Sequence, residues 1–298
     1  MLTGVLNIYK EKGYTSHDVV AIVRRIAETK KVGHTGTLDP DATGVLPICI
    51  GGATKLADYI ASADKTYIAE VILGVETNTG DISGEVLAEK PVHYDQTAIQ
   101  NAVSSFAYAN RGEYLQVPPM FSAIKIGGKK LYEIARKGET IDRPPRPVVI
   151  HHIRIKDFAP EKNAFTIEVK CSKGTYIRSL AQDIGTVLGC GATMGALERT
   201  QSGMFHISHA IPLDKLKEAK EAAQLPFLLM PPERLLPYPQ VFLKGTDAIH
   251  GRNGNPLPYS VTGEGAKDGD RFWLYDGLHQ RIGLFECKKG TLRPQVML

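Results

Sequence analysis

The 298-residue sequence lacks long apolar runs and paired cysteines. No stretch approaches the roughly 20 apolar residues that a membrane-spanning helix needs. The N-terminus has no charged region followed by an apolar one, so no secretory signal is indicated. The cysteines at positions 49, 171, 190 and 287 lack the C-x-x-C spacing of zinc sites and are typical of free thiols in a reducing compartment. We therefore expect a cytoplasmic protein without a membrane anchor.

The sequence also lacks the spacings that mark common metal and nucleotide sites. Of nine histidines only His151 and His152 are adjacent, and neighbours on a strand point to opposite faces. Gly44 is followed by Val45 where a P-loop has Lys and Ser or Thr, and Gly51-Gly52-Ala53-Thr54-Lys55 has the wrong spacing. We expect no bound metal, no nucleoside triphosphate and no cofactor.

What the chain does contain is an ordinary globular composition with one basic cluster. It is 43% hydrophobic and 23% charged, and long enough to bury a sizeable core. Its net charge is +4, and residues 120–150 hold seven basic against three acidic side chains, which accounts for the whole surplus. Met120, Phe121 and Tyr132 are interleaved with the charges. This pattern favours an arm that grips a phosphate backbone, although such clusters are often only solvated faces.

Residues 33–44 form the most distinctive stretch of the sequence. Three glycines, three threonines and a proline in twelve residues predict a tightly folded loop. The loop carries His34, Asp39 and Asp41 and lies between a candidate helix over 17–29 and the apolar run 45–50. Taken alone, Asp39 before Pro40 is typical of a turn. Loops clamped by apolar segments are also where catalytic groups concentrate.

Alternating apolar patterns predict strands with helices inserted between them. Strands are expected over 4–10, 45–50, 65–74, 85–89, 148–158, 164–171, 271–275, 281–287 and 291–297. Helices are expected over 17–29 with Ser16 as N-cap, over 54–61, 95–108 and 131–136, and from 175 onward. The order indicates an α+β fold around a mixed or antiparallel sheet. Residues 235–239 are expected to be a linker.

The string GHTGTLDPDATGVLPICIGGATK, residues 33–55, resembles the signature of the TruB family of tRNA pseudouridine synthases. The resemblance implies that Asp39 is the catalytic carboxylate and that His34 lies against the distorted RNA. Lys65-Thr66-Tyr67 matches a family K-x-Y context, which implies that Tyr67 stacks on the target base. No metal or redox cofactor is implied.

Two further segments resemble the same family. GTYIR, residues 174–178, implies that Arg178 pairs with Asp39 and that Tyr176 contacts substrate, and the L-x-R segment beginning at Leu197 implies a wall of the base pocket. PPMFSAIK, residues 118–125, resembles the start of an RNA-clasping thumb over 120–147. We expect the substrate-binding lysines to be Lys10, Lys125, Lys129 and Lys130.

The resemblance implies a pseudouridine-synthase-like catalytic domain over 1–236. Residues 240–298 resemble, more weakly, a PUA domain, which is a small RNA-binding barrel. The implied activity is isomerisation of uridine 55 in the T-loop of tRNA, by a monomer without an obligatory protein partner. The target base must leave its stack to reach such a site.

Several alternatives remain open at this level. A carboxylate can act as a nucleophile or remove a proton from the sugar, and the sequence does not choose between these roles. The chain could instead be a non-catalytic tRNA-binding or tRNA-folding protein of the same fold, or a guide-dependent dyskerin-like subunit. A metal-dependent hydrolase using Asp39 and Asp41 is a further alternative.

Overall fold

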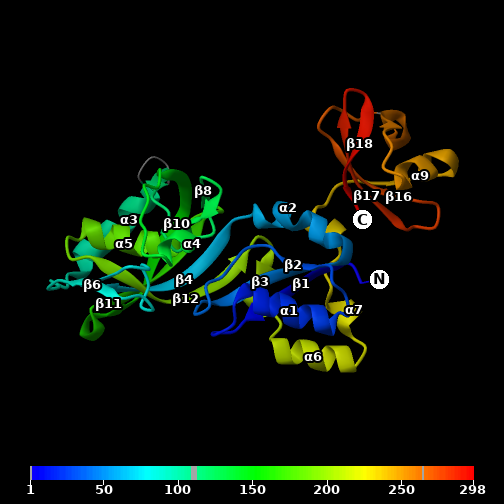
Figure 1. The fold of residues 1–298 in the computed structure, drawn as a ribbon. Helices are drawn as coiled ribbons and strands as arrows, with labels where there is room; N and C mark the ends of the chain where they lie inside the picture. The colour runs from blue at the N-terminus through cyan, green and yellow to red at the C-terminus, as the bar shows by residue number, and fades with distance from the viewer. Residues whose placement is uncertain (1, 109–112, 264) are drawn as a thin grey trace.

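The computed structural model describes residues 2–108, 113–263 and 265–298, and a large mixed sheet forms the body of the protein within these ranges (Figure 1). The strand order is β1-β3-β12-β4-β11-β10-β7, with β2 paired to β3 and β13 to β12. The bounds are β1 (Gly4–Lys10), β2 (Val32–His34), β3 (Thr43–Ile50), β4 (Lys65–Leu73), β7 (Glu113–Gln116), β10 (Arg146–Ala159), β11 (Ala164–Cys171), β12 (Ala192–Ser202) and β13 (Phe205–His206). The β3–β12 pair is parallel, whereas β1–β3, β4–β12, β4–β11 and β10–β11 are antiparallel. The predicted α+β fold with a mixed sheet is confirmed.

Two groups of helices cover the two halves of this sheet (Figure 1). The larger helices are α1 (Ser16–Ile26), α3 (Gln96–Tyr108), α5 (Ile177–Val187) and α6 (Leu213–Glu221). In one half, Val23 of α1 is buried with Ile48 of β3, and in the other, Leu180 of α5 is buried with Ile167 of β11. Tyr67 packs against both cores, so β4 crosses the middle of the sheet where the halves meet.

The first helix begins and ends differently from the prediction. Thr15, not Ser16, is the N-cap: its hydroxyl accepts the Asp18 N–H at 3.1 Å, and the Thr15 N–H donates to the Asp18 carboxylate at 2.8 Å. This reciprocal capping box satisfies two backbone donors at once. The helix ends at Ile26, short of the predicted 29. Ser16 is thereby free to bond elsewhere.

The remaining helix predictions are confirmed in existence and adjusted in extent. The predicted helix over 54–61 is a 3₁₀ turn (Gly51–Leu56) followed by α2 (Ala57–Ala61). The helix expected from residue 175 begins at Ile177. The predicted helices over 95–108 and 131–136 correspond to α3 and to α4 (Leu131–Ala135).

The thumb leaves and rejoins the sheet at one edge. β7 pairs with the first residues of β10, and the chain between them contains β8 (Lys125–Ile126), β9 (Lys129–Lys130) and α4. Another small hairpin, β5 (Val75–Thr77) with β6 (Val86–Glu89), follows β4. Both excursions therefore start from strands of the half that carries α3 and α5.

The C-terminal segment forms its own five-stranded sheet in the order β14-β16-β17-β18-β15. Its elements are β14 (Gln240–Phe242), α9 (Gly245–Arg252), β15 (Leu257–Pro258), β16 (Arg271–Tyr275), β17 (Arg281–Lys288) and β18 (Thr291–Met297). The three strands predicted from the sequence are present. The sheet is curled into a half-barrel, as expected of a PUA-like domain (Figure 1).

This C-terminal sheet shares a core with the main body. Trp273 and Leu284 are fully buried in one cluster with Val5 and Val45 of the central sheet. Residues 235–239, expected to be a linker, contribute to the same cluster, and the Trp273 indole N–H donates to the Leu236 carbonyl at 2.7 Å. The segment is a packed connection, because apolar side chains from both sheets close over it. The short helices α7 (Leu225–Leu228) and α8 (Pro232–Leu235) precede it.

Across the described residues, no helix has both the length and the apolar character needed to cross a membrane.

Candidate active site

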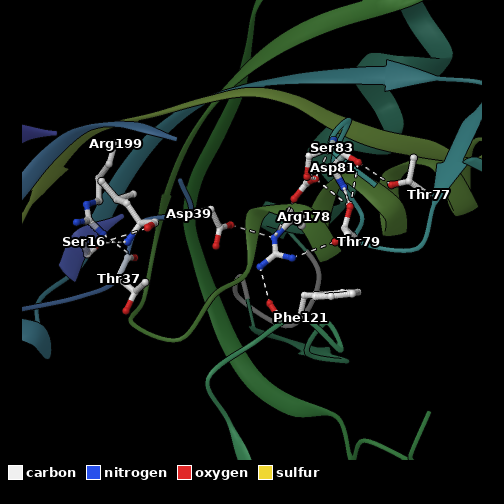
Figure 2. Close-up of polar contacts among 11 residues, drawn as sticks. Ser16, Thr37, Asp39, Thr77, Thr79, Asp81, Ser83, Phe121, Arg178 and Arg199 are labelled. Carbon is white, nitrogen blue, oxygen red and sulfur yellow. Dashed lines mark hydrogen bonds and ion pairs between the residues drawn. The ribbon is translucent and has the colours of Figure 1, made fainter. Parts of the chain in front are cut away.

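The loop over residues 33–44 is held from beneath by Arg199 of β12. This side chain is almost completely buried, and its guanidinium donates to the carbonyls of Val45 at 2.7 Å, Gly36 at 3.3 Å and Thr37 at 3.5 Å. Figure 2 shows the guanidinium beside Thr37. A buried guanidinium is costly unless its donors are satisfied, and the loop carbonyls supply those acceptors.

Gly44 allows β12 to come this close to the loop. It pairs with Arg199 in the parallel β3–β12 contact and has φ +103°. A Cβ at this position would lie 2.3 Å from the Arg199 carbonyl oxygen. Glycine is therefore required for both the backbone conformation and the approach of the strand.

Ser16 and Lys10 fix the part of the loop that flanks Asp39. The Ser16 hydroxyl accepts the Leu38 N–H at 2.9 Å and donates to the Leu38 carbonyl at 3.2 Å. The Lys10 ammonium donates to the carbonyls of Pro40 at 3.0 Å and Glu11 at 3.1 Å. Both backbone groups before Asp39 and the carbonyl after it are thus held by side chains.

Lys10 differs from the sequence-based expectation of an RNA contact. Its side chain is buried, and burial lowers its pKa to about 8 against the opposing effect of the Asp41 and Asp39 carboxylates. An enclosed ammonium bonded to carbonyls does not present its charge to a phosphate. The structure assigns Lys10 to the support of the loop.

Arg178 of α5 meets Asp39 across the sheet. The distance from the Arg178 Nε to the Asp39 Oδ2 is 3.1 Å, and the Asp39 side chain remains 41% exposed whereas that of Arg178 is 7% exposed. The other guanidinium nitrogens donate to the carbonyls of Thr79 at 3.0 Å and Phe121 at 2.9 Å (Figure 2). The pairing predicted for these two residues is present, with the guanidinium fixed and the carboxylate accessible.

Asp81 completes this arrangement and was missed in the sequence, where residues 77–84 indicate only a turn. Its Oδ2 lies 3.7 Å from the Arg178 Nε, and its Oδ1 accepts hydrogen bonds from the Thr79 hydroxyl at 2.9 Å and the Ser83 N–H at 3.1 Å. These bonds orient Asp81 toward Arg178 (Figure 2). No local signal distinguishes it, because its partner lies on a helix far along the chain.

The ion pair opens into a cavity of about 770 Å³. Asp39 and Arg178 line it together with Leu197, Phe121 and Met194. A cavity of this size falls in the range typical of small-molecule and cofactor pockets. Leu197, predicted as a pocket wall, does line it.

Tyr67 lies beside the loop and His34 lies within it, but neither is among the residues that line the cavity. Tyr67 of β4 is paired with Arg199 in the sheet register. The pKa of its hydroxyl is raised, mainly by burial and also by Asp39, against the opposing effect of the Arg199 guanidinium. His34 of β2 meets the His17 ring edge-on with centroids 5.4 Å apart, and burial lowers its pKa. A stacking role for Tyr67 and an RNA contact for His34 stay predictions.

The other predicted RNA-binding residues lie in the thumb and at the start of α5, and they are not among the residues that line the cavity. Tyr176 is the half-buried residue immediately before α5. Lys125 and Lys129 are exposed on the thumb hairpin, and Lys130 lies over the Tyr132 ring with 5.3 Å from Nζ to the ring centroid. In the ranges that the structure describes, no group of three or more His, Cys, Asp or Glu side chains is placed to hold a metal ion.

Comparison with known proteins places this architecture. The whole chain superimposes on a crystal structure of a Cbf5-Nop10-Gar1 complex with a TM-score of 0.70 and 26% identity, covering 99% of this chain and 84% of that one. Residues 24–177 match the family model "TruB family pseudouridylate synthase (N terminal domain)", and residues 178–237 match "tRNA pseudouridylate synthase B C-terminal domain". The fold and the family models are those of a pseudouridine synthase, an isomerase.

Sequence relatives define the family within that class. The chain is 46% identical to the tRNA pseudouridine synthase B of Alkaliphilus oremlandii, covering 96% of this chain and 89% of that protein. It is 48% identical to the tRNA pseudouridine synthase B of Bacillus pumilus, covering 87% and 84% respectively. The chain belongs to the TruB family of pseudouridylate synthases.

Proposed function

We propose that this enzyme isomerises uridine 55 in the T-loop of tRNA to pseudouridine, with Asp39 as the catalytic carboxylate. The observation that carries the proposal is the 3.1 Å contact between Asp39 and Arg178 in the lining of a cavity of about 770 Å³, which has room for a nucleoside. A fixed guanidinium balances the charge of the carboxylate and orients it, while the exposed fraction of Asp39 leaves it open to a substrate.

The chemistry requires only one base or nucleophile at the sugar. The N-glycosidic bond of uridine breaks, the uracil turns, a bond from C5 to the sugar C1′ forms, the C5 proton leaves to solvent, and the freed N1 takes up a proton. Asp39 either attacks C1′ to give an ester that the turned uracil displaces, or removes the C2′ proton and later returns it. Oδ2 is engaged by Arg178, so we assign the reacting position to Oδ1.

Substrate binding is divided between the cavity and the thumb. Flipping the uridine out of its stack costs a few kcal/mol, which interactions inside the cavity must offset. Leu197 is assigned to the wall against the base, with Tyr67, Tyr176 and His34 supporting the displaced nucleotide and its neighbours. Lys125, Lys129 and Lys130 are assigned to the phosphate backbone, because their charge on an exposed hairpin suits that role.

The guide-dependent alternative has weaker support. The relatives at 46% and 48% identity are named tRNA pseudouridine synthase B, whereas the neighbour crystallised with Nop10 and Gar1 is 26% identical. We propose that this chain works on tRNA in the cytoplasm as a monomer without a protein partner.

The direct test is incubation of the protein with an unmodified tRNA transcript, without cofactors, followed by mapping of pseudouridine. We expect modification at uridine 55 alone, and none in a transcript carrying cytidine there. If the activity is unchanged in the presence of a chelator, the alternative that the protein is a metal-dependent hydrolase is excluded. A fully intact transcript without pseudouridine, under conditions where the protein binds it, would contradict the proposal and favour the binding-only alternative.

A further inference from the structure

The segment that leads into the thumb runs along the start of helix α5. We call residues 116–121 the thumb base. They connect the end of β7 to the thumb, and Figure 2 shows their last residue, Phe121, directly beside Arg178. The thumb base and the start of α5 are far apart in sequence, so the hydrogen bonds between them link two separate parts of the fold.

Gln116 binds the residue before α5 with one side chain. It is 2% exposed; its Oε1 accepts the Tyr176 N–H at 2.8 Å, and its Nε2 donates to the Tyr176 carbonyl at 3.0 Å. A single amide thus holds both backbone groups of Tyr176. The first N–H groups of a helix have no partner within the helix, and Gln116 satisfies the one that belongs to Tyr176, the residue before α5.

Two more hydrogen bonds join the same segments. The Ser179 hydroxyl donates to the Val117 carbonyl at 2.9 Å, and the Arg178 Nη2 donates to the Phe121 carbonyl at 2.9 Å. Ser179 is 4% exposed and Arg178 is 6% exposed, so these bonds are shielded from competing water. The start of α5 is therefore bonded both to the first residues of the thumb base and to its last residue, Phe121.

We infer that Gln116 is a positioning residue that ties the orientation of Arg178 toward Asp39 to the position of the thumb base. The inference rests on the proposed function, since it assigns Arg178 to the reaction. Fixing Tyr176 fixes the direction in which α5 begins, and Arg178 lies two residues later. A shift of the thumb base would move the Phe121 carbonyl and the guanidinium together. RNA held by the thumb thus acts on the reacting carboxylate through these bonds.

Gln116→Met tests this directly, because it keeps the length of the side chain and removes both bonds to Tyr176, together with the bond from Nε2 to the Tyr114 hydroxyl. We expect the single-turnover rate at saturating tRNA to fall about 10- to 100-fold, the size of loss that small misplacement of catalytic groups causes. The Kd for tRNA should change by less than about threefold, since every lysine that faces the phosphate backbone is still present. Backbone amides of residues 176–180 should exchange hydrogen faster than in the wild type.

Thr175→Val is the matched control. It removes a neighbouring hydroxyl whose 3.0 Å bond to the Ser172 carbonyl stays within the turn before α5. This variant should keep the wild-type rate and the wild-type exchange over residues 176–180. If Gln116→Met does not fold, Ser179→Ala replaces it, with an expected rate loss of about 3- to 10-fold, because only one of the linking bonds is removed.

The outcomes separate this inference from the proposed function. A folded Gln116→Met protein with wild-type rate and exchange overturns the inference, as does a rate loss fully explained by weaker tRNA binding. If the wild type forms no pseudouridine, the proposed function fails. Hydrogen exchange over residues 176–180 then still decides whether Gln116 fixes the start of α5. If exchange in Gln116→Met is the same as in the wild type, this structural role of Gln116 is also overturned.

Discussion

The thumb and the loop that carries Asp39 differ in how they are held and in the side chains that they present. The loop over residues 33–44 is held by three buried polar side chains, Arg199, Ser16 and Lys10, each bonded to its backbone. The thumb over 120–147 is built from two-residue strands and a five-residue helix, with lysines on its surface. The loop holds the Asp39 carboxylate in place, whereas the thumb presents positive charge on its surface.

The difference follows from the physics of the two tasks. A reacting carboxylate must be placed within fractions of an ångström, so its loop is bonded to the interior on several sides. Attraction to a phosphate backbone acts over several ångströms and tolerates variation in geometry. Gly127 and Gly128, both with positive φ, lie in the turn between β8 and β9, and a Cβ added at either position would meet no atom within 4 Å. We therefore expect changes in the loop to act on rate and stability, and changes in the thumb to act on affinity.

Arg199→Met should give the largest of these effects short of removing Asp39. It keeps the side-chain length but leaves the carbonyls of Gly36, Thr37 and Val45 without their donor. We expect a loss of about 2–4 kcal/mol in the free energy of unfolding. The single-turnover rate should fall about 100-fold because the loop is misplaced.

Urea unfolding and single-turnover assays on the same protein measure both effects. Arg154→Met is the control, because Arg154 pairs with Glu168 on the surface at 2.9 Å with its own side chain 55% exposed. Its stability should stay within about 0.5 kcal/mol of the wild type. Wild-type stability and rate in Arg199→Met would show that the loop does not depend on this clamp.

Replacing Lys125, Lys129 and Lys130 together with Gln should weaken tRNA binding. The slope of log Kd against log salt should flatten by up to about 0.7–0.9 for each phosphate that the variant no longer neutralises. The single-turnover rate at saturating tRNA should hardly change. Replacing Lys215 and Lys217 of α6, on the opposite half of the sheet, should leave the slope as it is. An unchanged slope in the thumb variant would rule out contacts between these three lysines and the phosphate backbone of tRNA.

Lys10 should give an effect that is visible as a pH dependence of stability. Its pKa is lowered from 10.5 to about 8 in the folded protein. Between these values the unfolded chain binds more protons, so the folded state gains stability as pH rises. Lys10→Met lacks this contribution, whereas Lys65, whose pKa is also lowered to about 8, is common to both proteins.

The stability of the wild type relative to Lys10→Met should therefore increase from pH 8 to pH 10, measured by urea unfolding at each pH. A difference that stays constant or shrinks over this range would mean that folding does not lower the pKa of Lys10.

Periodic patterns were sufficient to predict most of the fold. Alternation over 65–74 and 164–171 predicts strands that the structure pairs with each other, and the apolar spacing in 95–108 predicts α3. Boundaries failed where a polar side chain had a competing partner, as at Thr15, where the capping box moves the N-cap. The prediction that residues 235–239 are a linker was wrong, because apolar side chains of the C-terminal sheet pack over this segment.

The site was predictable only in part. The long signature identified Asp39, and the short GTYIR and L-x-R segments identified Arg178 and Leu197; the structure brings these three to one cavity. Asp81 and Gln116 were missed, since each has its role only through a partner at or near the start of α5 that no local pattern indicates. Lys10 was predicted to bind substrate because the sequence does not reveal that loop carbonyls enclose its ammonium.

The central claim is that Asp39 performs the chemistry while its loop only holds it, and Asp39→Asn tests this most directly. The amide has nearly the same volume, so the loop should fold and tRNA should bind, but it is a poor nucleophile and a poor base. Release of the C5 hydrogen of uridine 55 should fall by many powers of ten, beyond the ~10²–10⁴ typical of losing a proton-transfer aid alone. Asp41→Asn should retain most activity and wild-type tRNA binding. Near wild-type turnover by a folded, tRNA-binding Asp39→Asn protein would contradict the account.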